Sequence, residues 1–167
     1  ILAGFAMHSM DDWPEPPEPV DNDECETARY LTDGNWPFTT LGGTTGNDPY
    51  NEDQCSGTYL GEMFSDVWFS YIACENGSMT VSTCDLIDFD SDIVVYQGSC
   101  GSLTQIACNG DGSGCSGYSS TTTFNVTEGA NYLIRVGGWA SGSAGTGTLS
   151  VDGPGTGCET DPVLIID

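Results

Sequence analysis

Apolar and polar residues alternate along most of the chain, and turn-forming residues interrupt this alternation about every 8–12 positions. No stretch keeps the helical period of an amphipathic helix. Alternation of this kind places one face of each strand against a core, so two packed antiparallel sheets are expected. The predicted strands cover residues 28–33, 38–43, 66–73, 77–84, 92–98, 103–108, 120–126, 131–138 and 147–153.

Two local features refine this pattern. Glu75, Asn76 and Gly77 lie between the third and fourth predicted strands and predict a hairpin turn that pairs them. Trp68 lies inside the third predicted strand, so we expect its large ring in the core.

The two ends of the chain depart from the alternating pattern. The first ten residues, ILAGFAMHSM, are almost uncharged, and the prolines that follow favour a stiff extended spacer. We therefore divide the chain into an apolar strand with a Pro/Glu spacer (1–20), a β-sandwich (21–153) and a C-terminal tail (154–167).

The apolar strand is a candidate for assembly between molecules. A stiff spacer favours its insertion into the sheet of a neighbouring copy, and such head-to-tail contacts build a filament. The alternatives are burial on the chain's own sheet, or a linker left from a larger protein. The residues expected to enter the neighbour are Ile1, Leu2, Ala3, Phe5 and Met7.

The charge is strongly unbalanced, with 25 acidic residues against two arginines and a formal net charge of −23. Such a surface repels nucleic acid and anionic lipid, and its excess carboxylate favours bound divalent cations. No run approaches the ~18 apolar residues of a membrane-spanning helix. We expect a secreted protein, extracellular or on the cell surface, without nucleic-acid partners or membrane insertion. Asn76 and Asn125 begin candidate glycosylation sequons.

Eight cysteines with one histidine and no CxxC pair indicate disulfide bonds in an oxidising compartment rather than a zinc site. The spacing leaves the pairing open. Candidate pairs are Cys74 with Cys84 across the predicted hairpin, Cys100 with Cys108 in a short loop, and Cys25 with Cys158 between the ends of the sandwich. The expected disulfide cysteines are Cys25, Cys55, Cys74, Cys84, Cys100, Cys108, Cys115 and Cys158.

Acidic and amide residues gather at three places in the sequence. DLIDFDSD carries carboxylates at alternate positions, NGDGSG repeats the spacing, and a third cluster begins at Asp21. Calcium binds several oxygens at short range, and alternate residues of a curled loop can supply them. The alternative is that Asp and Asn simply occupy turns. The candidate calcium ligands are Asp88, Asp90, Asp92, Asn109, Asp111, Asn22 and Asp23.

Catalysis has little support in the sequence. The only histidine, His8, lies in the apolar strand, and the chain has no lysine, so neither a Ser-His-Asp or Cys-His device nor lysine chemistry has support. Carboxylates abound, but nothing in the sequence singles out a pair for glycoside hydrolysis. We expect a protein that is not an enzyme. Three aromatic residues near predicted turns have two possible roles: stacking on sugar rings, or closing the ends of the sandwich. They are Trp36, Trp139 and Tyr118.

Four segments resemble the bacterial pre-peptidase C-terminal domains over residues 21–152: DVWFSYIACENGSMTVSTC, FDSDIVVYQGSCGSL, IACNGDGSGC and TTFNVTEGANYLIRVGGWASGSAGTGTLSV. The resemblance implies a jelly-roll-like sandwich in a secreted protein, without catalysis, often stabilised by calcium and sometimes binding carbohydrate or collagen. Two functions therefore compete. The apolar N-terminal strand favours a calcium-stabilised structural subunit that polymerises with copies of itself into a filament. The resemblance favours the alternative, a calcium-dependent module of a larger secreted protein that binds glycan or extracellular matrix.

Overall fold

The computed structural model describes residues 20–48, 50–55 and 63–155, and every structural statement below concerns these residues. The predicted assembly strand and most of the predicted C-terminal tail lie outside them. Two short 3-10 helices, η2 (Cys25–Thr27) and η3 (Glu52–Gln54), accompany nine strands. The strands are β1 (Arg29–Tyr30), β2 (Gly34–Thr39), β3 (Phe64–Ile72), β4 (Gly77–Ser82), β5 (Ser91–Ser99), β6 (Ser102–Asn109), β7 (Thr121–Val126), β8 (Asn131–Gly138) and β9 (Thr146–Asp152).

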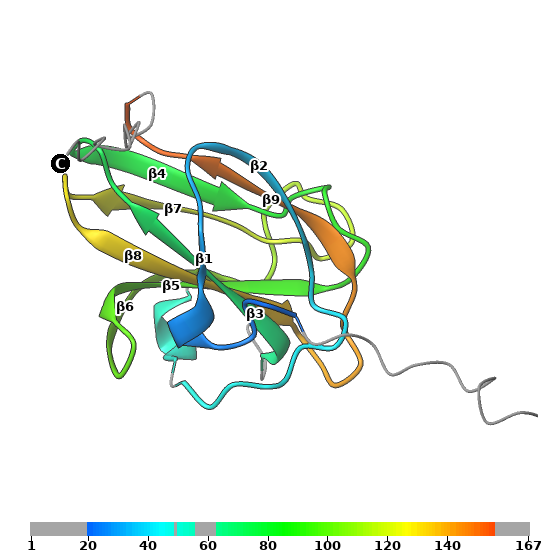
Figure 1. The fold of residues 1–167 in the computed structure, drawn as a ribbon. Coiled ribbons are helices and arrows are strands. Elements are labelled where there is room, and N and C mark those ends of the chain that lie inside the picture. The colour runs from blue at the N-terminus through cyan, green and yellow to red at the C-terminus, as the bar shows by residue number, and fades with distance from the viewer. Residues whose placement is uncertain (1–19, 49, 56–62, 156–167) are drawn as a thin grey trace, which may run out of the picture.

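The strands form two stacked sheets (Figure 1). One has the order β1-β3-β8-β5-β6 and the other the order β2-β9-β4-β7. Neighbouring strands pair antiparallel, except for the short parallel pair β1–β3. From β2 to β9 the chain crosses between the sheets at each connection except the β5–β6 hairpin, which gives the strand order of an eight-stranded jelly roll. The predicted all-β, jelly-roll-like sandwich is confirmed.

Seven of the nine predicted strands match the structure to within two residues at each end. The first two do not. β1 is only Arg29–Tyr30, and β2 begins at Gly34 and contains Pro37. Proline removes a backbone donor, and β2 tolerates it because this strand lies at the edge of its sheet and pairs only with β9.

The predicted hairpin at Glu75–Gly77 is wrong, because β3 and β4 belong to different sheets. β3 pairs with β1 and β8, whereas β4 pairs with β7 and β9. The Asn76 side chain accepts a hydrogen bond from the backbone N–H of Glu128, at 3.0 Å, and so ties this crossing turn to the β7–β8 turn. The turn residues reverse the chain direction, but they do not determine which sheet the next strand joins.

Apolar side chains form two separate cores. The first lies between the sheets and includes Val67, Phe69, Ile93 and Leu149. The second lies on the outer face of the five-stranded sheet and includes Trp68, Val94, Tyr96 and Leu133. β5 and β8 are therefore buried on both faces, which explains their nearly continuous apolar runs. Trp68 is fully buried as predicted, but in the outer core.

Two disulfide bonds, Cys25–Cys100 and Cys55–Cys108, contribute to this outer core. Cys25 pairs with Cys100, Cys55 with Cys108, and Cys84 with Cys115, so the three candidate pairs proposed from spacing are wrong. Cys74 is also disulfide-bonded, and the described residues contain no free cysteine. Cys158 lies outside the described residues. Sequence spacing failed here because each bond joins segments that are distant in sequence, and the predicted hairpin that would bring Cys74 beside Cys84 does not exist.

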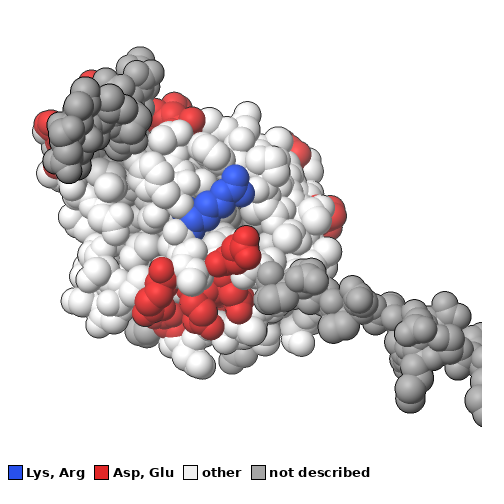
Figure 2. All heavy atoms as spheres, in the orientation of Figure 1, with Lys and Arg blue, Asp and Glu red and all other residues white. Residues whose placement is uncertain are grey.

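The surface is mostly acidic or neutral, with a patch of basic atoms near acidic groups on the face that Figure 2 shows. Of the two arginines in the chain, Arg135 is buried and Arg29 is exposed. The Arg29 guanidinium lies 5.3 Å from the centre of the Trp36 ring. Among the described residues, no helix is long and apolar enough to cross a membrane.

Candidate functional site

The candidate site lies at one end of the five-stranded sheet, where β5 begins and β6 and β8 end. β5 is the central strand of these three: Asp92 pairs with Gly137 of β8, and Ile93 pairs with Asn109 of β6. Antiparallel pairing therefore brings the segments around Asp90, Asp111 and Trp139 to the same end of the sheet. There they enclose a pocket of about 410 Å³, lined by Asp90, Asp111, Tyr118 and Trp139.

Two aromatic rings stand exposed beside this pocket. Tyr118 is 68% exposed and Trp139 is 45% exposed. Tyr118 has φ +57°, in the left-handed region that non-glycine residues rarely adopt. Backbone conformations of this kind persist where the surrounding structure holds them, and they gather at functional positions. Tyr118 and Trp139 therefore leave part of their surface uncovered beside the pocket. Trp36 lies in β2 and does not line the pocket.

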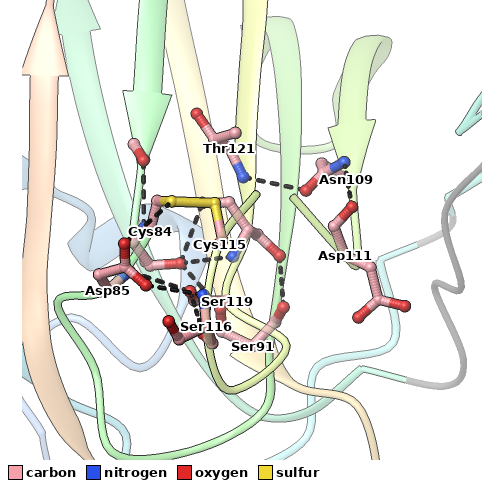
Figure 3. Close-up of a disulfide and its surroundings, with 12 residues drawn as sticks. Cys84, Asp85, Ser91, Asn109, Asp111, Cys115, Ser116, Ser119 and Thr121 are labelled. Carbon is pink, nitrogen blue, oxygen red and sulfur yellow. Dashed lines mark hydrogen bonds between the residues drawn. A yellow bond between two sulfur atoms is a disulfide. The ribbon is translucent and has the colours of Figure 1, made fainter. Parts of the chain in front are cut away.

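The loop that carries Tyr118 is held by the Cys84–Cys115 disulfide and by Asp85 (Figure 3). One Asp85 carboxylate oxygen accepts the backbone N–H of Ser116 at 2.6 Å, and this hydrogen bond lowers the pKa of Asp85. The backbone N–H of Asp85 in turn donates to Ser119 Oγ at 3.0 Å. Tyr118 is therefore anchored on both sides, at Ser116 and at Ser119.

Asn109 organises the other wall of the site. Its Oδ1 accepts the backbone N–H of Thr121 at 2.9 Å, and its Nδ2 donates to the backbone oxygen of Asp111 at 3.4 Å. In Figure 3 the Asp111 carboxylate points away from Asn109 and from the disulfide. Asn109 thus shapes the loop, and Asp111 presents its charge to the pocket.

Asp92 follows Asp90 by two residues, is fully buried and does not line the pocket. Neither of its carboxylate oxygens has a hydrogen-bond partner. Burial, together with the charges of Asp90, Asp111 and Glu52, raises the pKa of Asp92 to about 8. Burial and the charge of Asp111 raise the pKa of Asp90 to about 6. Asp90 and Asp111 line the same pocket, and the charges of both raise the pKa of Asp92. The three residues are hereafter called the carboxylate cluster.

The remaining predicted calcium ligands lie elsewhere and hold loops. Asp88 accepts the backbone N–H and the hydroxyl of Thr146, at 2.7 and 3.0 Å. Asp23 accepts the same two groups of Thr44, at 2.6 and 2.9 Å. Asn22 donates to the backbone oxygen of Trp68 at 2.8 Å. None of the three lines the pocket.

Sequence reasoning did not place the aromatic rings beside the carboxylates. The signal was available: Asp90 precedes one predicted strand, and Trp139 follows another. An antiparallel pairing of these two strands puts both residues at one end of the sheet. The contribution of Glu52 was also missed, because η3 reaches this region only through the fold.

Comparison with known proteins gives one family. A profile described as galactose binding domain-like, and associated with T9SS, matches residues 21–151. No curated protein matches the chain. The match supports the predicted secreted β-sandwich but not the pre-peptidase C-terminal family in particular. Together with the disulfide bonds, it indicates a secreted or cell-surface protein. The chain therefore belongs to the galactose binding domain-like family associated with T9SS.

Proposed function

We propose that this domain is a non-catalytic carbohydrate-binding module of a secreted or cell-surface protein, and that it binds sugar in the pocket between Tyr118 and Trp139. The observation that carries the proposal is the combination of two exposed aromatic rings with two carboxylates around one pocket. Family membership supports the same function.

The aromatic rings supply the apolar part of recognition. A sugar ring presents a face of C–H groups that packs on an aromatic plane, which removes apolar surface of both from water. Tyr118 and Trp139 have such surface available, because both side chains are exposed. The loop of Tyr118 is held by a disulfide and a hydrogen bond, and the backbone N–H of Trp139 donates to the backbone oxygen of Asp90 at 3.2 Å. Little ordering is therefore needed when a ligand binds.

The carboxylates supply the polar part. Asp90 and Asp111 line the same pocket, and ionised carboxylates accept hydrogen bonds from hydroxyl groups. A pocket of about 410 Å³ is in the size range of small-molecule sites. An apolar wall with a few polar groups matches the alternation of C–H faces and hydroxyls on a sugar.

A larger hollow, of about 740 Å³, is a weaker candidate. It is lined by residues that include Arg29, Pro37 and Phe38. Its aromatic residue, Phe38, is partly buried against the core and packs nearly perpendicular to Phe69 and Phe89, whereas the smaller pocket has two exposed aromatic side chains.

Replacing Trp139 by alanine is expected to weaken sugar binding at least tenfold, equivalent to about 1.4 kcal/mol, because the sugar loses its stacking surface. Tyr118→Ala should have a similar effect. Binding would be measured by titration calorimetry with galactose, galactose-containing oligosaccharides and galactan, after a glycan array has ranked the ligands.

Tyr30→Ala provides the matched control. Tyr30 is an aromatic residue of comparable exposure, 42%, but it lies in β1 and does not line the pocket. Its replacement should leave binding unchanged. Binding that survives both pocket replacements, or an array on which the intact protein retains no glycan, would contradict the proposal.

The filament function depends on Ile1, Leu2, Ala3, Phe5 and Met7, which lie outside the described residues. No observation in the described part of the chain favours it, so assembly by donor-strand insertion stays a prediction.

A further inference from the structure

We propose that Asp90, Asp92 and Asp111 bind a calcium ion at the end of the five-stranded sheet where the pocket lies. This inference goes beyond carbohydrate binding and does not depend on it. It narrows the seven calcium ligands suggested by the sequence to three carboxylates that the fold brings into one cluster.

The first argument is the state of Asp92. Its side chain is fully buried, and both carboxylate oxygens lack hydrogen-bond partners. Buried charged groups in proteins are normally paired, hydrogen-bonded or coordinated to a metal, because an isolated buried charge is strongly unfavourable. A bound cation would satisfy both oxygens.

The second argument is the absence of a competing protein cation. The chain has only two basic residues besides His8. The Arg135 guanidinium is already engaged: it donates to both Asp66 oxygens and to the backbone oxygens of Gly46 and Asp48. Arg29 lines a different hollow. Neither arginine is therefore free to neutralise the carboxylate cluster.

The third argument is the donor chemistry. The cluster offers only oxygen ligands, which suit calcium or magnesium rather than transition metals. Among the described residues, no group of three His, Cys, Asp or Glu side chains is arranged to hold a metal ion, so binding requires side chains of the cluster to turn. Calcium tolerates irregular geometry and completes its shell with backbone carbonyls and water. The Asp90 and Asp111 carboxylates accept no hydrogen bond from other described residues, so they are free to turn toward an ion beside Asp92.

The test compares thermal unfolding of the intact protein and of Asp92→Asn, each in excess chelator and in 100-fold excess of calcium over the measured Kd. For the intact protein we expect calcium to raise Tm by about 5–10 °C, because the ion binds only the folded state. For Asp92→Asn we expect no rise. In chelator, Asp92→Asn should melt at or above the temperature of the intact protein, because the variant removes a buried carboxyl group whose oxygens have no hydrogen-bond partner.

Glu128→Gln provides the control, since Glu128 is an exposed acid in the β7–β8 turn, at the opposite end of the sheet. It should keep the full response to calcium. Magnesium at the same concentration should give a smaller rise. Equal melting with calcium and chelator, or a calcium response that persists in Asp92→Asn, would overturn the proposal.

Terbium luminescence gives an independent readout that involves no sugar. A lanthanide ion in the carboxylate cluster would lie beside Trp139 and Tyr118, so excitation of these rings should sensitise its emission. Calcium should displace the signal, and Asp111→Asn should reduce it. Emission without glycan binding would support the cation site and count against the sugar site. Glycan binding without emission would support the sugar site and count against the cation site.

Discussion

Asp66→Ala is expected to lower the free energy of unfolding by about 3–5 kcal/mol, the usual effect of breaking a buried ion pair from one side. Asp66 and Arg135 are both buried, and the guanidinium donates to the two carboxylate oxygens at 2.8 and 2.9 Å. Burial alone would lower the pKa of Arg135, but the hydrogen bonds and charge of Asp66 outweigh it and raise that pKa. Alanine would leave the guanidinium charged, buried and without a counter-ion.

The same replacement also removes a hydrogen bond that holds the loop containing Gly46 and Asp48 over the outer core. Asp66 also accepts the backbone N–H of Gly46, and Arg135 donates to the backbone oxygens of Gly46 and Asp48. The ion pair therefore fastens this loop over the outer core, where Arg135 lies 5.5 Å from the centre of the Trp68 ring. A cation above an aromatic face adds to the stability of this arrangement.

Urea denaturation followed by tryptophan fluorescence would measure the effect. Replacing the exposed acid Glu128 by alanine should change the free energy of unfolding by less than about 0.5 kcal/mol, as is usual for surface positions. The double variant Asp66→Ala, Arg135→Met removes both charges and should recover part of the loss. A single variant as stable as the intact protein would show that the ion pair does not hold this layer.

Removing the Cys25–Cys100 bond through the double serine variant is expected to lower the free energy of unfolding by about 4–5 kcal/mol. The bond closes a loop of 75 residues, and opening it restores conformational freedom to the unfolded chain. In the folded protein it fastens η2 to the β5–β6 turn, at the edge of the outer core.

The Cys84–Cys115 bond provides the matched comparison. It closes 31 residues, so its double serine variant should lose about 0.8 kcal/mol less than the Cys25–Cys100 variant. Because it holds the loop of Tyr118, it should also weaken sugar binding, whereas the Cys25–Cys100 variant should not. Both effects would be read from urea denaturation and from the binding titration. The reverse order of stabilities would contradict the loop-closure explanation.

Much of the fold was readable from the alternation of apolar and polar residues. Strand 131–138 was predicted to the residue, since its apolar run, its turn signals and its partners agree. The hairpin predicted at Glu75–Gly77 was wrong. A turn signal is local, whereas the sheet that each strand joins depends on contacts with β7, β8 and β9. The disulfide pairs failed for the same reason: spacing along the chain does not give distance in space.

The candidate site was likewise predicted only in part. The alternating carboxylates indicated an ion, and Asp90, Asp92 and Asp111 do form one cluster. Asp88 belongs to the same sequence motif but caps the start of β9, because the chain turns between Asp88 and Asp90 toward the other sheet. That Asp66 and Arg135 neutralise each other was not predicted, since 69 residues separate them and only the fold brings them together.

The two arginines have a further consequence, for digestion. Proteases that cut after lysine or arginine find only two target bonds in the chain, because it contains no lysine. The bond after Arg135 is buried within β8. The bond after Arg29 lies in β1. The Arg29 guanidinium donates a hydrogen bond to the backbone oxygen of Pro37 and lies over the ring of Trp36, so it is already engaged within the fold. A folded domain of this composition therefore resists trypsin-like enzymes through its scarcity of cleavage points as well as through its stability.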